Sequence, residues 1–301
     1  MTPAPTVSVI TISLHDLDGL KRTVDSVRAQ RYGGRIEHIV IDGGSGDDVV
    51  DYLSGCEPGF TYWQSEPDGG RYEAMNQGIA HASGDLLWFM NSGDRFSDPD
   101  AVAQVVEAIS GHGPARDVWG YGKQNQIGPD GRRWGRWGPM PFNIHNFLTG
   151  LAVAPHQAAF FGSSLVSKLG GYDLDWGIAA DQLFIFRAAL LREPITIQRV
   201  VCDYDLSGVG VQRPVREHFR DVRRLWDLYD CYPLGGRRTS LAYMRLWEYM
   251  IRAKAAAAST VGSLRTQLRR GIDVNQGFVP LLPASPDCPD GPHATSRAAR
   301  A

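Results

Sequence analysis

The first hundred residues alternate between strand-like and helix-like segments, and this alternation limits the fold more than any other feature. Short apolar or β-branched runs predict buried strands at Val7–Ser13, Ile36–Ile41, Phe60–Gln64 and Leu86–Met90. Apolar residues at helical spacing predict helices over residues 16–31, 47–54, 72–82 and 99–109. This alternation is typical of a parallel, doubly wound α/β sheet, which binds ligands at the carboxyl ends of its strands.

Polar residues stand at those carboxyl ends. Ser13, Asp42, Asp68 and Asp94 each close or follow a predicted strand, so the topology brings all four to one edge of the sheet. Asp94 is the most informative of them, because it follows the very apolar segment Leu86–Met90. A strand end needs polar residues but no carboxylate, so Asp94 either terminates the strand or faces a cation.

The rest of the chain is organised differently. Residues 118–141, rich in Gly and Trp, predict a hairpin or an excursion from the sheet, and Pro155–Phe161 predicts another strand. Further helices are predicted over residues 165–169, 180–191, 216–228 and 241–270. We therefore expect an α/β domain over residues 1–212, a helical extension over 213–275 and a disordered tail over 276–301, where Pro, Ala, Ser and Gly are frequent.

Composition and termini exclude several classes of protein. The 301 residues carry a formal net charge of −2 and no basic run interleaved with aromatic residues, so nucleic acid is not an expected partner. Four scattered cysteines without a CxxC pair predict neither a zinc site nor a disulfide framework. The N-terminus lacks the features of a signal peptide, and no uncharged apolar segment reaches about 18 residues. A cytoplasmic protein is therefore expected.

The segment IDGGSGD, from Ile41 to Asp47, invites comparison with a dinucleotide-binding loop. Its glycines follow the second predicted strand rather than the first and lack the GxGxxG spacing, and the chain has no P-loop signature. Asp42 at the strand end suits hydrogen bonds from a base or a ribose, and it equally suits a simple Asp-Gly turn. Spacing alone leaves both interpretations open.

Five motifs follow one another along the chain: VSVITIS, IVIDGGSGD, SEPDGGRYEAMNQGIAHASGDLLWFMNSGD, HQAAFF and GGYDLDWGIAADQLFIFRA. Together they resemble the family 2 glycosyltransferases, which are GT-A fold enzymes that use nucleotide-diphospho-sugars. The EPDxGxYxAMNxG and NSGD segments are most similar to the branch that builds cell-surface and exopolysaccharide sugars, of the colanic-acid transferase type. The resemblance covers about residues 7 to 210 and leaves the C-terminal third of the chain unassigned.

The resemblance implies a role for the acid after the fourth strand. In the family this strand ends in a DxD-type motif whose acids hold a divalent metal and the sugar-nucleotide. Asp94 matches the metal-binding acid, whereas Ser92 replaces the first acid and could bond a ribose. Mg²⁺ or Mn²⁺ is the implied cofactor, because such an ion neutralises the two charges of a leaving nucleoside diphosphate.

Asp181 matches the catalytic acid of the family. An inverting transfer needs one base that takes the proton from the acceptor hydroxyl as its oxygen attacks the anomeric carbon. The alternative role for Asp181 is that of a helix N-cap. The resemblance also matches Asp42 to the base-binding acid, and Thr11 to Ser13 to the strand end that lines the nucleotide.

The EPDxG element and the helix after it supply further candidates. Asp68 and Gly70 match the family's residues near the ribose and diphosphate. Arg71 could contact the diphosphate or simply lie on the surface. Asn76, one helical turn beyond Tyr72, could cap the pocket or hydrogen-bond the backbone.

Candidates on the acceptor side come from the second half of the motif order. His156 precedes an apolar strand, so it could approach the metal or the acceptor, or it could be a satisfied core residue. Aromatic faces stack on sugars, and the candidate platforms, some of which must be core, are Trp119, Trp134, Trp137 and Trp176. Trp176, just ahead of Asp181, is the best candidate for the acceptor side.

The C-terminal region is basic and amphipathic. Arginines recur from Arg213 to Arg270, with apolar residues such as Trp226 and Leu246 between them. This pattern is consistent with a surface that rests on anionic lipid at the inner face of the plasma membrane. The alternative is a solvated helix face that packs on the core.

Taken with the resemblance, the sequence predicts a metal-dependent, inverting glycosyltransferase with a UDP- or GDP-linked sugar donor. The expected acceptor is a hydroxyl of a glycan, glycolipid or lipid-linked molecule in cell-surface polysaccharide or glycolipid synthesis. One alternative is a degenerate sugar-nucleotide-binding protein, in which Ser92 marks a loss of activity. The other is a sugar nucleotidyltransferase, which would carry a Gly-rich basic loop where this chain has Ser13-Leu14-His15-Asp16.

Overall fold

The computed structural model describes residues 3–57, 59–208 and 214–265. The chain divides into two compact units. The first unit comprises residues 1–142 and 154–208, and the second comprises residues 143–153 and 209–301. The domain boundaries at residues 212 and 275 stay a prediction.

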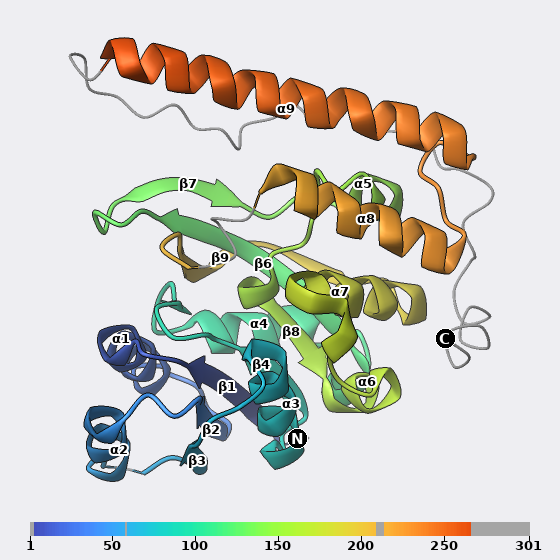
Figure 1. Cartoon of the computed structure of the whole chain (residues 1–301). Helices are drawn as coiled ribbons and strands as arrows, with labels where there is room; N and C mark the ends of the chain where they lie inside the picture. The colour runs from blue at the N-terminus through green and yellow to red at the C-terminus, as the bar shows by residue number, and fades with distance from the viewer. Residues whose placement is uncertain (1–2, 58, 209–213, 266–301) are drawn as a thin grey trace. The chain divides into compact units, whose positions relative to one another are not determined.

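A mixed sheet of nine strands runs through the described part of the first unit (Figure 1). The strands are β1 (Val7–Ser13), β2 (Ile36–Asp42), β3 (Tyr62–Ser65), β4 (Leu86–Phe89), β5 (Arg95–Phe96), β6 (Trp119–Ile127), β7 (Arg133–Trp137), β8 (Ala159–Gly162) and β9 (Ile195–Asp205). Their order is β3-β2-β1-β4-β8-β6-β9-β5, with β7 paired to β6.

The first four strands are parallel, as the strand–helix alternation predicts. β1 pairs with β2 and with β4, and β2 pairs with β3. In this register Ser13 lies opposite Asp42, and Asp42 lies opposite Ser65. The polar strand ends therefore share one edge of the sheet, which confirms that part of the prediction.

The second half of the sheet combines both directions. β8 is antiparallel to β4 and to β6, and β9 is parallel to β6. The short strand β5 is antiparallel to β9, with Arg95 opposite Asp203. This pairing brings the carboxyl end of β9 beside Asp94, although the two segments are more than a hundred residues apart in the chain.

Helices cover both faces of the sheet, as in a doubly wound fold (Figure 1). The helices of this unit are α1 (Leu17–Arg28), α2 (Asp47–Ser54), α3 (Arg71–His81), α4 (Ala101–Ile109), α6 (Ser163–Leu169) and α7 (Ala180–Leu191). Val27 of α1 and Val102 of α4 pack with Val9 and Trp88 on one face. On the other face α3 crosses β1 at Gly78, where a Cβ would lie 2.4 Å from Ile10 Cγ2, so only glycine fits.

Three details differ from the sequence-based expectation. The helix expected from Pro99, with Asp98 as its N-cap, begins at Ala101 with Asp100 as N-cap, because Asp98 Oδ1 accepts the Asp100 N–H in a turn before it. The strand expected from Pro155 begins at Ala159, after a short 3₁₀ helix. Residues 118–141 form a hairpin as expected, but β6 lies inside the sheet, so the excursion alternative is wrong.

The second unit consists of helices in its described part. They are α5 (Ile144–Leu148), α8 (Val215–Tyr229) and α9 (Arg237–Arg265). Trp226 of α8 is buried and donates its indole N–H to the Leu148 carbonyl at 2.7 Å. An ion pair at 3.7 Å joins Arg223 of α8 to Glu248 of α9. Neither of these two helices nor any other described helix has both the length and the hydrophobicity of a membrane span.

The cysteines only partly match the expectation. Cys56 and Cys202 are buried free thiols. Cys231 is disulfide-bonded, which its isolated position in the sequence did not predict.

Candidate active site

Residues 91–94 form a turn after β4 that is held by Thr23 of α1. The Thr23 hydroxyl donates to the Asp94 carbonyl at 2.6 Å and accepts from the Gly93 N–H at 3.1 Å. Gly93 has a φ of 93°, and a Cβ there would lie 3.2 Å from Asp205 Oδ2. A side chain at Gly93 would be strained in this backbone conformation. The turn thus gives Asp94 a defined position at the carboxyl edge of the sheet.

The Asp94 carboxylate is buried, with 4% of its surface exposed. Burial raises the pKa of Asp94 well above its ordinary value, the Asp205 N–H bonded to it opposes this rise, and the Asp205 charge adds to it. Asp94 Oδ1 accepts that N–H at 2.9 Å, while Oδ2 has no hydrogen bond within the described residues. A buried carboxylate with one free oxygen beside a second carboxylate suits a cation.

The second carboxylate belongs to Asp205, the last residue of β9. Its Oδ1 accepts the Ser207 N–H at 2.8 Å, and its Oδ2 lies 3.7 Å from a guanidinium nitrogen of Arg22. Asp205 therefore contributes both a backbone donor to Asp94 and a negative charge next to it.

Asp181 is the second residue of α7 and is partly exposed. The N-cap of this helix is Ala179, so the N-cap interpretation of Asp181 is wrong. Its Oδ1 accepts the Gln182 N–H at 2.8 Å. Burial raises the pKa of Tyr72 and Tyr172, and the Asp181 charge raises both further, so its carboxylate lies near two phenol groups.

The pKa of Tyr204 responds to the charges of both predicted acids. Burial is the main cause of the raised pKa of Tyr204, and the charges of Asp94 and then Asp181 raise it further. One tyrosine thus lies within electrostatic reach of both carboxylates. The charges of both predicted acids therefore act on Tyr204.

Asp42 is fully buried at the end of β2. Its Oδ2 accepts hydrogen bonds from the Ser45 N–H at 2.8 Å, the Gly44 N–H at 3.2 Å and the Ser65 hydroxyl at 2.7 Å. These hydrogen bonds are the ones expected for a simple Asp-Gly turn, and they order the loop that follows the strand.

Two buried polar atoms near the strand ends have no hydrogen-bond partner among the described residues: Ser13 Oγ, at the end of β1, and Asn91 Oδ1, just after β4. Native structures satisfy most buried polar atoms, so these two are places where a ligand or water would bind. Thr11, two residues before Ser13, is fully buried and shares a hydrogen bond of 3.0 Å with His38 Nε2.

The EPDxG element lies beside this edge. Asp68 Oδ1 accepts the Gly70 N–H at 2.7 Å, and Asp68 Oδ2 would be 3.1 Å from a Cβ on Gly43. Gly70 is the N-cap of α3, whose first residue is Arg71. Arg71 has no hydrogen bond or ion pair in the described part of the chain, and its charge lowers the pKa of Tyr72 and Tyr204. A helix start with an unpaired arginine favours an anion.

Asn76 and His156 both fix the position of Tyr172. Asn76 donates to the Tyr172 carbonyl at 2.9 Å and accepts the Tyr172 N–H at 2.8 Å, which is the backbone interpretation of this residue. His156 is buried, lies 2.7 Å from the Tyr172 hydroxyl and stacks on Phe89. Burial lowers the pKa of His156, although the Asp181 charge opposes this effect. His156 is thus part of the inner wall of the site.

The tryptophans separate into two groups. Trp119 is fully buried, and Trp176 is only 5% exposed, so Trp176 has no open ring face for a sugar. Trp134 is 58% exposed, and Trp137 lines a cavity elsewhere on the unit.

Ser92 is bonded to a carboxylate that the sequence did not single out as part of a site. Its hydroxyl donates to Asp16 Oδ2 at 2.8 Å, and Asp16 is also the N-cap of α1. Ser92, where the family resemblance would place the first DxD acid, therefore has a carboxylate as its neighbour.

The residues present fit a divalent ion that binds together with substrate. No three His, Cys, Asp or Glu residues within the described ranges are arranged to hold a metal alone. Asp94 Oδ2 has no hydrogen-bond partner within the described residues, and the charge of Asp205 acts on the Asp94 carboxylate. Mg²⁺ is commonly held by one or two carboxylates together with substrate phosphates, and these two acids suit that arrangement.

Sequence reasoning missed Asp205, Tyr204 and Asp16. Asp16 had a detectable signal, because an acid at the start of a helix follows directly on the first strand. Tyr204 and Asp205 had none, because β9 itself was not predicted.

Parallel strands that end in a buried acid, with a second acid at the start of a later helix, are the arrangement expected of the GT-A fold. Solved structures agree on this fold. The mannosyltransferase PcManGT from Pyrobaculum calidifontis, in complex with GDP-Man and Mn²⁺, has a TM-score of 0.58 at 20% identity over 89% of this chain and 82% of its own. S. aureus TarS 1-349 in complex with UDP-GlcNAc has a TM-score of 0.58 at 16% identity over 73% of this chain and 65% of its own.

Sequence comparison identifies the family. The profile described as "Glycosyl transferase family 2" matches residues 8–169. An "Uncharacterized glycosyltransferase" of Mycobacterium tuberculosis is 68% identical over 249 residues, which are 83% of this chain and 94% of that protein. A "PGL/p-HBAD biosynthesis glycosyltransferase" of Mycobacterium bovis is 29% identical over 272 residues, 87% of this chain and 98% of that protein. The chain belongs to glycosyltransferase family 2 and is a glycosyltransferase, which confirms the resemblance read from the motifs.

Proposed function

We propose that this glycosyltransferase moves a sugar from a UDP- or GDP-linked donor to a hydroxyl of a glycan, glycolipid or lipid-linked acceptor, with inversion, in cell-surface polysaccharide or glycolipid synthesis. The observation that supports this best is the buried Asp94 at the carboxyl edge of the sheet, where the Asp205 N–H bonds one of its carboxylate oxygens at 2.9 Å. Asp94 is buried with one free oxygen, which suits a cation. Asp181 is partly exposed at the start of a helix, which suits proton transfer. Two solved structures of the same fold are complexes with UDP-GlcNAc and with GDP-Man, which are donors of this class.

In the proposed reaction, the acceptor oxygen attacks the anomeric carbon while the bond from that carbon to the diphosphate oxygen breaks. Asp181 takes the proton of the acceptor hydroxyl, and the electron pair of the broken bond leaves with the diphosphate. Arg71 and the free N–H groups at the start of α3 would bind the diphosphate. Asp68 and the unpaired Ser13 hydroxyl would bind the nucleoside.

Mg²⁺ or Mn²⁺ would be held by Asp94 and Asp205, with the remaining positions taken by diphosphate oxygens and water. When bound, the ion supplies positive charge that neutralises the leaving nucleoside diphosphate. Ser92, whose hydroxyl donates to Asp16, would accept a hydrogen bond from a ribose hydroxyl.

A thermal-shift screen with UDP, GDP, CDP and dTDP, each with and without Mn²⁺, tests the donor class. A ligand that binds only the folded state stabilises it by about 2.7 kcal/mol at a concentration one hundred times its Kd. We expect a shift with UDP or GDP that requires Mn²⁺. No shift with any of the four nucleotides would contradict the proposal at its first step.

Asp181→Asn tests the chemical step separately from binding. We expect release of nucleoside diphosphate from the donor to fall by about 10² to 10⁴, with the nucleotide-dependent thermal shift unchanged. Asp48→Asn is the matched control, because Asp48 is an exposed acid in the first turn of α2. If the unmodified protein binds nucleotide but never turns it over with any acceptor, a degenerate binding protein is the better description.

Contact with an anionic membrane is a second proposal, and it rests on α9. Leu246 and Tyr249 are 56% and 72% exposed, and the exposed Arg238, Arg245 and Arg252 lie at helical spacing around them. In α8, by contrast, Leu225 and Trp226 are buried, so these two residues would not contact lipid. The lipid-facing surface is therefore proposed for α9 alone.

Flotation with vesicles tests this contact. We expect the protein to float with vesicles that contain phosphatidylglycerol and to remain unbound with pure phosphatidylcholine. Leu246→Glu and Tyr249→Glu should each reduce flotation, whereas Val50→Glu, at an exposed position of α2, should not. Equal flotation of all variants would contradict the proposal that α9 contacts the lipid.

A further inference from the structure

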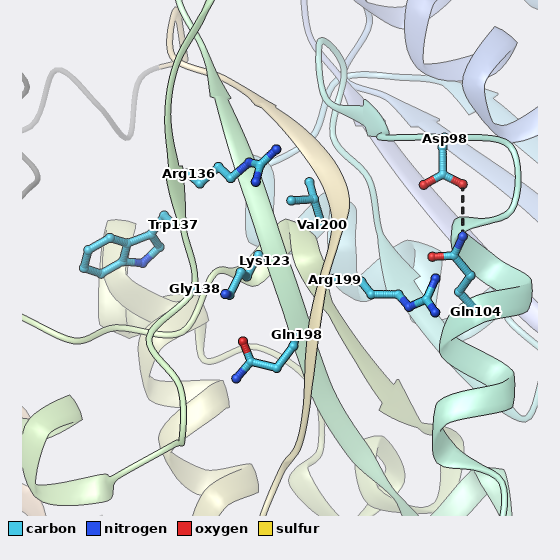
Figure 2. Close-up of a pocket in the computed structure, with 9 residues that line it drawn as sticks. All are labelled: Asp98, Gln104, Lys123, Arg136, Trp137, Gly138, Gln198, Arg199 and Val200. Atoms are coloured by element: carbon cyan, nitrogen blue, oxygen red, sulfur yellow. Dashed lines mark hydrogen bonds between the residues drawn. The ribbon is translucent and has the colours of Figure 1, made fainter.

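A cavity of about 590 Å³ lies in the first unit, among β6, β7, β9 and the start of α4 (Figure 2). Its lining residues are Asp98, Gln104, Lys123, Arg136, Trp137, Gly138, Gln198, Arg199 and Val200. None of these residues belongs to the candidate active site. Val200 is five residues before Asp205 on β9, which corresponds to about 16 Å along a strand. A group bound in this cavity is therefore distinct from the diphosphate of the donor.

The lining carries more positive than negative charge. Figure 2 shows Lys123 extending from β6, Arg136 from β7 and Arg199 from β9. The side chains of Lys123 and Arg199 make no hydrogen bond or ion pair with any residue in the described ranges. Arg136 donates only to the amide oxygen of Asn125, at 3.3 Å. Lys123 extends toward β7, whereas Arg199 extends the other way, toward Gln104 of α4 (Figure 2). An anion between β6 and β7 would therefore contact Lys123 and Arg136.

The one acid of the lining does not neutralise these cations. Asp98 Oδ1 accepts the Asp100 N–H at 2.8 Å and lies 3.5 Å from the Gln104 side-chain amide. Asp98 forms no ion pair within the described part of the chain. It therefore leaves the region with an excess of about two positive charges.

A β-bulge creates this arrangement. Tyr121 pairs with Thr196, but Lys123, two residues on, pairs with Val200, so β9 has two additional residues over the same length. Gln198 and Arg199 fall in this irregular stretch and are exposed. Bulges of this kind redirect side chains and are frequent next to binding sites.

The remaining lining groups suit a carbohydrate better than a bare anion. Gln104 and Gln198 offer amide donors and acceptors for hydroxyl groups, and the partly buried Trp137 offers an aromatic surface. The volume is within the range of small-molecule sites. We propose that this cavity binds the anionic group of a carbohydrate, a phosphate or carboxylate carried on a sugar, at a site separate from that of the donor.

Titration of ¹⁵N-labelled protein without nucleotide tests the proposal, so its outcome does not depend on the proposed transfer reaction. The indole N–H signal of Trp137 is assigned with Trp137→Phe. Glucose 1-phosphate and glucuronate should each move this signal to saturation, whereas glucose at the same concentration should not. Lys123→Ala and Arg136→Ala should each weaken binding about tenfold or more, because each removes a charged contact.

Arg133→Ala is the matched control, because Arg133 is an exposed arginine of the same strand β7 outside the cavity. It should change the affinity less than about twofold, and thermal melting should show that all variants remain folded. The proposal is overturned if neither anionic sugar produces a saturable shift, or if Arg133→Ala weakens binding as much as the cavity variants do. It is also overturned if vesicles with phosphatidylglycerol move the Trp137 signal and the sugars do not.

Discussion

Replacing Thr23 by valine should loosen the turn that carries Asp94. The side chains have nearly the same shape, so the change removes a hydroxyl and leaves the packing of this fully buried position almost intact. The hydroxyl donates to the Asp94 carbonyl at 2.6 Å and accepts from the Gly93 N–H at 3.1 Å. Valine therefore leaves one backbone acceptor and one backbone donor without their partner.

The expected cost follows from those two groups. A buried polar group that loses its partner costs about 1–3 kcal/mol, so two such groups together with some relaxation predict a loss of about 2–4 kcal/mol in the free energy of unfolding. Thr23→Ser is the matched control, since it keeps the hydroxyl and removes one methyl group, at a cost of about 1 kcal/mol.

Urea unfolding followed by circular dichroism measures both variants against the unmodified protein. We expect Thr23→Val to be the less stable of the two, and to lose the Mn²⁺-dependent part of the thermal shift with nucleotide, because Asp94 no longer has a fixed position. The reasoning is refuted if Thr23→Val unfolds within about 0.5 kcal/mol of the unmodified protein, or if Thr23→Ser is equally destabilised.

Three other perturbations test other parts of the structure. Asp205→Asn should weaken Mn²⁺ binding in the presence of UDP at least about tenfold, as measured by the electron paramagnetic resonance of free Mn²⁺. Asp203→Asn is the control and should leave Mn²⁺ binding unchanged, because the Asp203 carboxylate pairs with Arg95 at 3.1 Å. Burial lowers the pKa of His38 to about 3, so the unfolded chain binds a proton below pH 6.5 that the folded chain does not. The free energy of unfolding should then fall by about 1.4 kcal/mol for each pH unit below 6.5 because of this residue. In urea unfolding between about pH 6 and pH 4.5, His38→Gln should therefore reduce the dependence of this free energy on pH by about that amount. Gly78→Ala should destabilise the protein by about 1–3 kcal/mol in the same assay, because its Cβ would lie 2.4 Å from Ile10 Cγ2, and a gain in stability from helix propensity would contradict this close contact.

The parallel half of the sheet could be predicted from the sequence because its signals are local. Each of its first four strands is a short apolar run, and three of them are followed within a few residues by a helix. Val7–Ser13 and the helix at residues 47–54 match the structure to the residue. The edge at which Ser13 and Asp42 lie then follows from parallel register alone.

The other half of the sheet could not be predicted in this way. β9 contains the charged or polar residues Gln198, Arg199 and Asp203 and alternates irregularly because of its bulge, so its sequence has no clear period of two. β5 has only two residues. Both strands exist because they pair with segments far away in the chain, and a local pattern contains no information on such pairing.

This difference matters most for Asp94. The motif predicted an acid at the end of β4, but the groups that determine its properties come from α1 and from the end of β9. Thr23 fixes the backbone of the turn, and the Asp205 N–H bonds one carboxylate oxygen, which leaves the other oxygen free for a ligand. Ser92 in the first DxD position does not by itself indicate a lost site, because Asp205 supplies a second carboxylate beside Asp94 and Asp16 supplies one beside Ser92. The negative charge of the site thus comes from acids in several separate segments of the chain. A motif that covers only one of these segments therefore predicts fewer acids than the site contains.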